Sequence, residues 1–381
     1  MNIVEIRGYQ LAFEPPVPLG NASNFIRRRE FLLLEVLTED GTSGWGEVGA
    51  SPWAAAALIR HGLGAQLLGK SVRDYGRIFH GLMSALGYDR RGPAMMAISA
   101  IDMALHDAAA RVQGISVAAM LGGALRQQVL AYASGPFIAE GDDPYGAYPT
   151  EVEAYLRRGF RAIKPRAGAD PRADGVMVET LRHVMGPELG LMVDINRGYI
   201  ARAAIDAARH MAPAGLLWIE EPVQPEDLPG YRAVAAAVPT AIAGGEALGS
   251  LTAFRDFLVA ATLSVVQPDL SVCGGYSGLA RVAALAAAFD VPAMPHVFGT
   301  VVNFHASLQM AALLPARRGG GPAPYPFIEY DVSPNPLLSV LGEIPLNPDG
   351  TVSVPEGPGA GFTLRGEQLA PWLTETWRIA P

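Results

Sequence analysis

The stretch LMVDINRGYIARAAIDAARHMAPAGLLWIE (191–220) decides the fold of this chain. It contains two short apolar runs, LMVDI and LLWIE, and an alanine-rich segment with helical periodicity lies between them. A strand, a helix and a loop together need roughly 25 to 30 residues, and parallel strands require such a crossover connection. The stretch therefore predicts a strand–helix–strand unit that places one carboxylate, Asp194 or Glu220, at the end of each strand.

The same unit recurs along the second half of the chain. Further apolar runs that end in a polar side chain are FRAIK (160–164), IAGGE (242–246), SVVQPD (264–269) and VPAMPH (291–296). One functional group per strand–helix unit, always where the strand ends, is the layout of an active site on an eight-stranded βα barrel. The regular spacing predicts a barrel enzyme, with QQVLAYAS (127–134) as its first strand and FIEY (327–330) as its eighth.

The chain is longer than a bare barrel, which needs roughly 250 residues, because it has 381. Residues 1 to about 50 alternate like antiparallel strands, with Asp40-Gly41 as a hairpin turn, and three helical stretches follow at about 53–69, 73–87 and 93–112. We predict an α/β fold: a (βα)8-type, TIM-like barrel with an α+β capping domain formed by the N-terminal region and the C-terminal tail. The predicted boundaries are 1–125 for the cap, 126–330 for the barrel and 331–381 for a segment that returns to the cap.

Composition excludes several classes of protein. Half of the residues are hydrophobic and 17% are charged, which indicates a globular chain. A net charge of −8, with no basic run longer than Arg27-Arg28-Arg29, argues against a nucleic-acid partner. No uncharged apolar segment reaches the roughly 18 residues of a membrane span, and the N-terminus lacks a signal-peptide core. The single cysteine, Cys273, suits a reducing compartment and a structural role, so we expect a cytoplasmic protein with no membrane association.

Three carboxylates end consecutive predicted strands: Asp194, Glu220 and Glu246. Neighbouring strand ends lie roughly 5 Å apart, so these groups would repel one another unless a cation lay among them. Hard oxygen ligands favour Mg²⁺, with Mn²⁺ as a substitute. In WIEEP (218–222), strand alternation makes Glu220 a better ligand than Glu221. The alternative is that each acid pairs with a loop arginine.

Lys164 and Arg166 lie two residues apart and therefore on the same face of the second strand. A lysine partly buried beside a divalent cation has a lowered pKa, which suits acid/base chemistry. An arginine is a permanent cation, so Arg166 is suited to binding a substrate carboxylate and poorly suited to acting as a base. The alternative is a pair of solvated cations on a strand edge.

The remaining candidates end the sixth, seventh and eighth strands. Adjacent strand ends can hold the Asp269 carboxylate against the His296 imidazole and fix its tautomer. Glu329 would face the same cavity, where a neutral carboxylic acid can donate a hydrogen bond to developing charge; the alternative is a loop salt bridge. Asn196 shares the face of Asp194 and is expected to hydrogen-bond a substrate oxygen.

With these residues in place, the chain resembles the enolase superfamily, specifically its mandelate racemase-like subgroup, part of the mandelate racemase/muconate lactonizing enzyme-like proteins. The motifs that carry the resemblance are KPR (164–166), VDIN (193–196), WIEEP (218–222), GGE (244–246), QPD (267–269), PHVFG (295–299) and IEY (328–330). The resemblance implies a homo-oligomer. It also implies Mg²⁺ on Asp194, Glu220 and Glu246, a base dyad of Asp269 with His296, Lys164 as electrophilic partner of the substrate carboxylate, and Glu329 as hydrogen-bond donor to an enolate.

One position departs from the subgroup's pattern. The racemase-like enzymes commonly carry Lys-x-Lys on the second strand, and the second lysine is the base opposite the histidine; here Arg166 occupies that place. We therefore expect one-base chemistry by His296, most simply Mg²⁺-dependent dehydration of an acid sugar (an aldonate or aldarate) to a 2-keto-3-deoxy acid through an enediolate. That reaction is a lyase reaction. The alternatives are an aldarolactone cycloisomerase (an isomerase), a racemase or epimerase of a 2-hydroxy acid, and a non-catalytic sugar-acid binding protein. Loops 15–25 and 47–53 are expected to close over the cavity.

Overall fold

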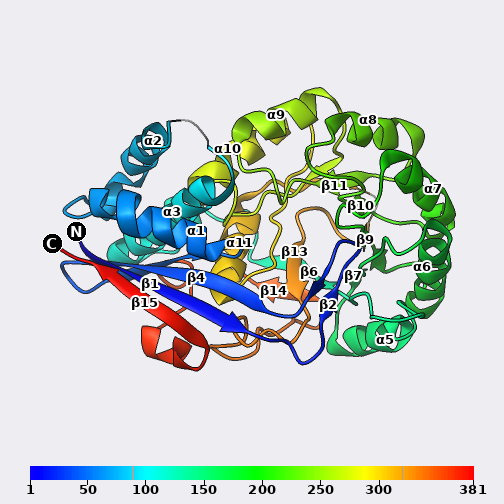
Figure 1. Cartoon of the computed structure of the whole chain (residues 1–381), viewed down its shortest axis with the longest axis horizontal. Helices are drawn as coiled ribbons and strands as arrows, with labels where there is room; N and C mark the ends of the chain where they lie inside the picture. The colour runs from blue at the N-terminus through cyan, green and yellow to red at the C-terminus, as the bar shows by residue number, and fades with distance from the viewer. Residues whose placement is uncertain (88–89, 320) are drawn as a thin grey trace.

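The computed structural model describes residues 1–87, 90–319 and 321–381, and it consists of a sheet-and-helix cap beside a larger βα barrel (Figure 1). The fold class predicted from the sequence is therefore confirmed. The first and last strands of the chain lie next to each other in the cap, with both termini at the end of the molecule away from the barrel (Figure 1). The exact domain boundaries stay a prediction.

The cap is a four-stranded antiparallel sheet of order β15-β1-β4-β5. Its strands and helices are β1 (Ile3–Phe13), β4 (Arg29–Thr38), β5 (Ser43–Val48), β15 (Leu373–Ile379), α1 (Pro52–Leu58), α2 (Tyr75–Ala85), α3 (Gly92–Gln113) and the short α4 (Val117–Met120). The helix α3 approaches β5 so closely that a Cβ added at Gly46 would lie 1.9 Å from the Ala100 carbonyl oxygen. Among the described residues, no helix is long and apolar enough to cross a membrane.

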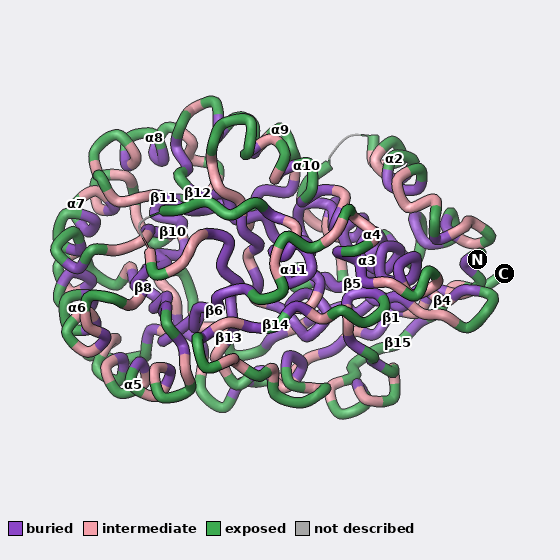
Figure 2. The backbone as a smooth tube through the Cα atoms, turned by 180° about the vertical axis from the view of Figure 1, so that it is seen from behind, coloured by how far each residue is buried: buried purple, intermediate pink, exposed green. Residues whose placement is uncertain are grey.

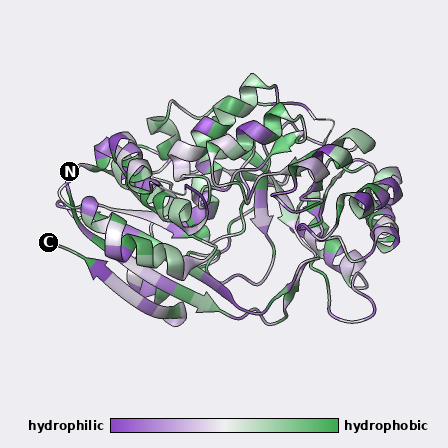
Figure 3. Ribbon diagram, turned by 45° about the horizontal axis from the view of Figure 1, so that its top comes forward, coloured by the Kyte–Doolittle hydropathy of each residue, from purple (hydrophilic) through white to green (hydrophobic). Residues whose placement is uncertain are grey.

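The barrel strands run parallel and bring their carboxyl ends to one edge. They are β6 (Gln128–Ser134), β7 (Ala162–Lys164), β8 (Gly190–Leu191), β9 (Val193–Asp194), β10 (Ile219–Glu220), β11 (Ile242–Gly244), β12 (Val265–Val266) and β13 (Ile328–Asp331). The helices are α5 (Tyr148–Arg158), α6 (Pro171–Met185), α7 (Ala201–Met211), α8 (Leu228–Ala237), α9 (Leu251–Val259), α10 (Gly275–Ala288) and α11 (Val301–Leu313). They cover the outside of the strands and carry both hydrophilic and hydrophobic residues (Figure 3).

The interior of the barrel is a packed core. Tyr132, Trp218 and Phe327 are fully buried there, and the ring of Trp218 lies 5.8 Å from that of Tyr132 and 6.1 Å from that of Phe327. Figure 2 shows buried backbone along the strands and exposed backbone on the outer helices. Because these large side chains fill the barrel, a substrate can enter only at the carboxyl-end rim.

Three local features differ in detail from the expected ones. The stretch 53–69 is not one helix, since α1 ends at Leu58 and a π-helical turn (Ile59–Leu63) and a 3-10 turn (Gly64–Gln66) follow; close packing of Gly64 against Ile379 accompanies the change. The tail lies on the cap through β15, and its strand β14 (Thr351–Ser353) also pairs with the barrel strand β6. The predicted loop 15–25 contains a short hairpin, β2 (Leu19–Gly20) with β3 (Phe25–Ile26).

The seventh predicted strand, 291–296, is irregular. It is joined to its neighbour by hydrogen bonds from the Val266 amide to the Pro292 carbonyl and from the Met294 amide to the Val266 carbonyl. Pro292 and Pro295 have no amide hydrogen, so this segment cannot form a continuous ladder. The segment nevertheless delivers His296 to the rim, where its amide donates to the Pro268 carbonyl.

Replacement of Gly46 by alanine tests the cap packing. The added methyl group would overpack the contact with α3, and we expect the free energy of unfolding to fall by about 1–3 kcal/mol in chemical denaturation. Gly81→Ala is the matched control because a Cβ at this exposed position of α2 meets nothing within 4 Å. It should leave stability unchanged or raise it by up to about 1 kcal/mol. Equal effects of the two substitutions would contradict the packing argument.

Candidate active site

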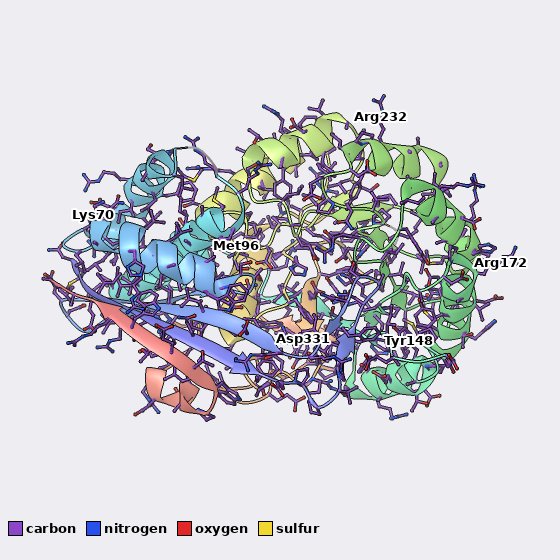
Figure 4. All side chains as sticks on the ribbon, in the orientation of Figure 1. Lys70, Met96, Tyr148, Arg172, Arg232 and Asp331 are labelled. Carbon is purple, nitrogen blue, oxygen red and sulfur yellow. The ribbon has the colours of Figure 1, made fainter. Side chains whose placement is uncertain are left out.

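The predicted site residues meet at the carboxyl-end rim of the barrel. Lys164, Asp194, Glu220, Asp269 and Glu329 are buried, and His296 and Glu246 are nearly so. Beside them lies a cavity of about 420 Å³ whose lining includes Arg166, Asn196, Glu246, Asp269 and His296. The cap closes the cavity from the other side, in part through Met96 on α3, which is labelled in Figure 4.

The three predicted metal ligands form one cluster. Asp194, Glu220 and Glu246 each offer a carboxylate oxygen within 4.8 Å of the other two. The parallel register that pairs Glu220 with Asp194 places the first two side by side. Two cations compensate them: Lys164, the last residue of β7, hydrogen-bonds Glu220, and Arg166, two residues beyond β7, hydrogen-bonds Asp194. A compact set of hard oxygen donors fits a divalent cation such as Mg²⁺.

A second layer of side chains orients the ligand Glu220. Its Oε2 accepts hydrogen bonds from the Trp218 indole (2.9 Å) and from the Gln267 amide (2.7 Å), which directs Oε1 toward the cluster. Burial raises the pKa of Glu220 to about 7, although Lys164 lowers it. Glu221 has a positive φ of 40° and contacts Arg197 at 3.3 Å, outside the cluster. The hydrogen bond from Gln267 to Glu220 was not predicted from the sequence because the two residues come from different strands.

Lys164 and Arg166 are buried cations, so the alternative of two solvated charges is wrong. Burial alone would lower the pKa of Lys164, but the carboxylates around it, Glu220 foremost, outweigh burial and raise the pKa. The lowered pKa expected for this lysine is thus not found when carboxylates alone surround it. Arg166 also donates to Ser134 Oγ at 3.2 Å, and its guanidinium lies 5.4 Å from the Phe137 ring centre.

His296 and Asp269 form the predicted pair. His296 Nδ1 lies 2.8 Å from Asp269 Oδ2, and His296 Nε2 lies 3.1 Å from Glu246 Oε2. Burial lowers the pKa of His296, but the charges of Glu246 and Glu329 outweigh it and raise the pKa well above its usual value. The other oxygen of Asp269 accepts hydrogen bonds from the Ser271 amide and hydroxyl, both at 2.7 Å. With Nδ1 held by Asp269, Nε2 is the nitrogen directed toward the carboxylate cluster.

Glu329 lies inside the rim, where its charge is compensated. It accepts hydrogen bonds from Ser134 Oγ at 2.6 Å and from the Val297 amide at 3.1 Å, and Lys164 Nζ lies 3.0 Å away. Burial would raise the pKa of Glu329, but the charges of Lys164 and His296 outweigh it and lower the pKa. The expected role of Glu329 as a neutral hydrogen-bond donor stays a prediction.

Asn196 lines the cavity in a strained backbone conformation with φ of 44°. Its backbone N–H donates to Asp194 Oδ1 at 2.8 Å. The buried side-chain oxygen Oδ1 has no hydrogen-bond partner among the described residues. An unpaired buried acceptor next to a cavity is costly unless a ligand supplies a donor. This is consistent with substrate binding, which stays a prediction.

The cap supplies lining residues from both loops expected to close the cavity. Leu19 and Asn21 come from the first loop, and Gly49 and Ala50 from the second. Glu47, at the end of β5, also reaches the cavity although it is fully buried. Burial raises the pKa of Glu47 to about 7, although hydrogen bonds from Thr300 lower it. An acid inside the buried run GWGEV (44–48) is the signal that could have drawn attention to it.

These features define a class: capped barrel enzymes that combine a carboxylate metal cluster with a histidine–aspartate base. Residues 147–369 match the family model described as enolase C-terminal domain-like. Residues 8–122 match the N-terminal domain of mandelate racemase and muconate lactonizing enzyme. The chain belongs to the enolase superfamily, among its mandelate racemase/muconate lactonizing enzyme-like proteins.

Relatives match the chain over nearly its whole length. D-galactarolactone cycloisomerase of Agrobacterium fabrum is 34% identical, with 97% of this chain and 98% of the relative covered. L-talarate/galactarate dehydratase of Salmonella typhimurium is 30% identical, with coverages of 96% and 90%. The crystal structure of a racemase from Streptomyces coelicolor with bound magnesium superposes with a TM-score of 0.87 at 30% identity, covering 98% of this chain and all (100%) of that one.

Mg²⁺ is expected to raise the melting temperature of the unmodified protein, since a ligand that binds only the folded state stabilises it. At 100 times its Kd the gain is about 2.7 kcal/mol. Glu246→Gln should remove most of this rise, because an amide supplies no negative charge to the cation. Differential scanning fluorimetry with and without MgCl₂ measures the shift. Glu153→Gln on α5 is the control, since Glu153 is exposed and far along the chain from the cluster; a full shift in Glu246→Gln would contradict the ligand assignment.

Proposed function

We propose that the chain is a Mg²⁺-dependent acid-sugar dehydratase, with Mn²⁺ as a possible substitute metal. It would remove the proton α to a carboxylate and expel the β-hydroxyl, giving a 2-keto-3-deoxy acid. The observation that carries the proposal is the asymmetry of the cavity lining. The lining includes one imidazole, His296, and it has a permanent cation, Arg166, at the position where a second base would be needed for racemisation. The dehydratase and magnesium-bound relatives support it.

In the proposed mechanism the chain's residues have separate tasks. Arg166 and Asn196 hold the substrate carboxylate and a neighbouring oxygen. Asp269 fixes the tautomer of His296, whose Nε2 takes the α-proton and then returns it to the departing hydroxyl group, so that water leaves. Lys164 places its buried ammonium against the charge that develops on the carboxylate oxygens.

The metal cluster and Glu329 complete the site. A divalent cation held by Asp194, Glu220 and Glu246 would supply positive charge that makes the α-proton more acidic. Glu329, in its protonated form beside Lys164, would donate a hydrogen bond to an enediolate oxygen.

A second candidate function is cycloisomerisation of an aldarolactone. The observation that favours it is the match to the Agrobacterium cycloisomerase over 97% of this chain. Breaking the ring C–O bond of a lactone is also a β-elimination from an enediolate, and it needs only one base. Racemisation or epimerisation ranks lower because of Arg166. A purely binding role ranks lowest because the metal cluster and the His296–Asp269 pair are both complete.

A screen separates these reactions. The protein with Mg²⁺ is incubated with a panel of aldonates, aldarates and aldarolactones in D₂O, and NMR and a 2-keto acid assay follow the products. We expect keto-acid formation from at least one open-chain acid. Ring opening of lactones alone would favour the cycloisomerase, and deuterium exchange without elimination would contradict both. His296→Asn should lower the rate by about 10²–10⁴-fold, the usual contribution of a general base.

Arg166→Lys tests whether the cation binds or catalyses. A lysine would lose the fork geometry and the contact with Phe137, so we expect the elimination rate to fall by about 10–100-fold, the equivalent of one charge-assisted hydrogen bond of about 1.5–3 kcal/mol. Steady-state kinetics on the best substrate measures it. The matched control is Arg157→Lys, an exposed arginine on α5. Faster α-proton exchange in Arg166→Lys would show instead that a second base had been restored.

We also propose a homo-oligomeric protein of the cytoplasm that acts on small carboxylates and binds no nucleic acid. The single cysteine supports the cytoplasm, and the net charge of −8 argues against nucleic-acid binding. Size-exclusion chromatography with light scattering determines the oligomeric state.

A further inference from the structure

The segment that follows the base is held by polar side chains from outside it. Arg29 donates to the Phe298 carbonyl at 2.9 Å, and Asn335 donates to the Gly299 carbonyl at 2.8 Å. Glu47 accepts from the next group, the Thr300 amide, at 2.9 Å. Arg29 and Glu47 are buried residues of the cap strands β4 and β5. The cap therefore holds the backbone that begins two residues after His296.

The Glu47 carboxylate lies at the N-terminus of α11. Besides the Thr300 amide, it accepts hydrogen bonds from Thr300 Oγ1 at 2.6 Å and from the Asn303 amide at 2.9 Å. All of these partners are donors, and the positive end of the helix dipole adds to the attraction. A Cβ at Gly299 would lie 2.2 Å from Glu47 Oε1, so only glycine allows this close approach. The position is thus built to receive a carboxylate.

The first turn of α11 connects this carboxylate to the base. The amide of Asn303 is held by Glu47, while its side-chain Nδ2 donates to Asp269 Oδ1 at 3.2 Å. Ser307 Oγ donates to Asn303 Oδ1 at 3.3 Å and so fixes which way the Asn303 amide points. Asp269 Oδ2 then lies 2.8 Å from His296 Nδ1. Glu47, Asn303, Asp269 and His296 are thus linked in series by hydrogen bonds, from the cap to the imidazole.

We propose that Glu47 is a positioning residue for His296: it fixes the start of α11, and through Asn303 and Asp269 it sets the direction of the imidazole. This rests on the proposed function, in which His296 is the base. Misplacing a reacting group by about 1 Å can cost 10²-fold in rate. Glu47 thereby makes the orientation of the base depend on the cap being seated on the barrel.

The test is Glu47→Gln, which keeps the size and shape of the side chain but removes the negative charge to which three donors hydrogen-bond. We expect kcat to fall about tenfold while KM changes less than twofold and the Mg²⁺-induced melting shift is retained. The deuterium isotope effect at the α-carbon should rise, because proton abstraction becomes slower. Glu39→Gln, the same change at an exposed cap position, is the control and should behave like the unmodified protein. A rise in KM at constant kcat would overturn the proposal, since it would show direct contact with substrate.

A double-mutant cycle tests the route. If Glu47 acts on His296 through Asn303, the double variant Glu47→Gln/Asn303→Leu should lose no more kcat than the more strongly affected single variant. Losses that multiply would overturn the route. Should Glu47→Gln not fold, Thr300→Val removes the hydroxyl that donates to Glu47 and accepts from the Val302 amide, and it should lower kcat. Thr300→Ser keeps both hydrogen bonds and should restore kcat. Equal kcat in these two variants would also count against the proposal.

A measurement without substrate separates this proposal from the proposed function. In protein with ¹⁵N-labelled histidine, the Nδ1 proton of His296 should give a slowly exchanging NMR signal because it is buried against Asp269. Glu47→Gln should make its exchange with water at least tenfold faster, and Glu39→Gln should not. If the unmodified protein eliminates no acid sugar yet this difference appears, the proposed function fails and the positioning holds. Unchanged exchange would overturn the positioning.

Discussion

Like charges buried at the barrel rim are the constraint on which the rest of the structure depends. Asp194, Glu220 and Glu246 would destabilise the fold if nothing offset their mutual repulsion, because buried charges are costly unless paired. Two cations spaced two residues apart provide the offset: Lys164 at the end of β7 and Arg166 just beyond it. That pairing leaves a site whose charges are fixed in place before any ligand arrives, which is how preorganised electrostatics lowers a barrier.

The cap has a structural share in this electrostatic arrangement. It lines the cavity with residues from two loops and from α3, which limits the access of water to the buried charges. It also sends Arg29 and Glu47 into the loop that follows His296. Buried hydrogen bonds therefore join the cap to the loop that carries His296, so the geometry of the site depends on both domains.

The sequence predicted which residues end the strands far better than it predicted their electrostatic states. A period set by the length of a strand–helix unit is a local property, so Asp194, Glu220 and His296 could be placed at the rim from spacing alone. The pKa of Lys164 is raised and not lowered because of Glu220 and Glu329, which come from β10 and β13 and not from the strands beside β7. For the same reason the hydrogen-bond partners of Glu47 and Gln267 were not predicted. The tilt of the strands and the closure of the barrel decide which side chains meet across it. A periodic sequence pattern predicts neither.

The pairing of β15 with β1 has a consequence for how the molecule is made. Ile6 lies opposite Ile379, so the cap sheet joins residues from nearly opposite ends of the chain. During synthesis the sheet stays one strand short until the final segment has emerged, whereas every barrel strand and helix has been completed earlier. Contacts between such distant residues form slowly because a long loop must close first. The order of translation thus favours a barrel that forms first and a cap whose sheet is completed last.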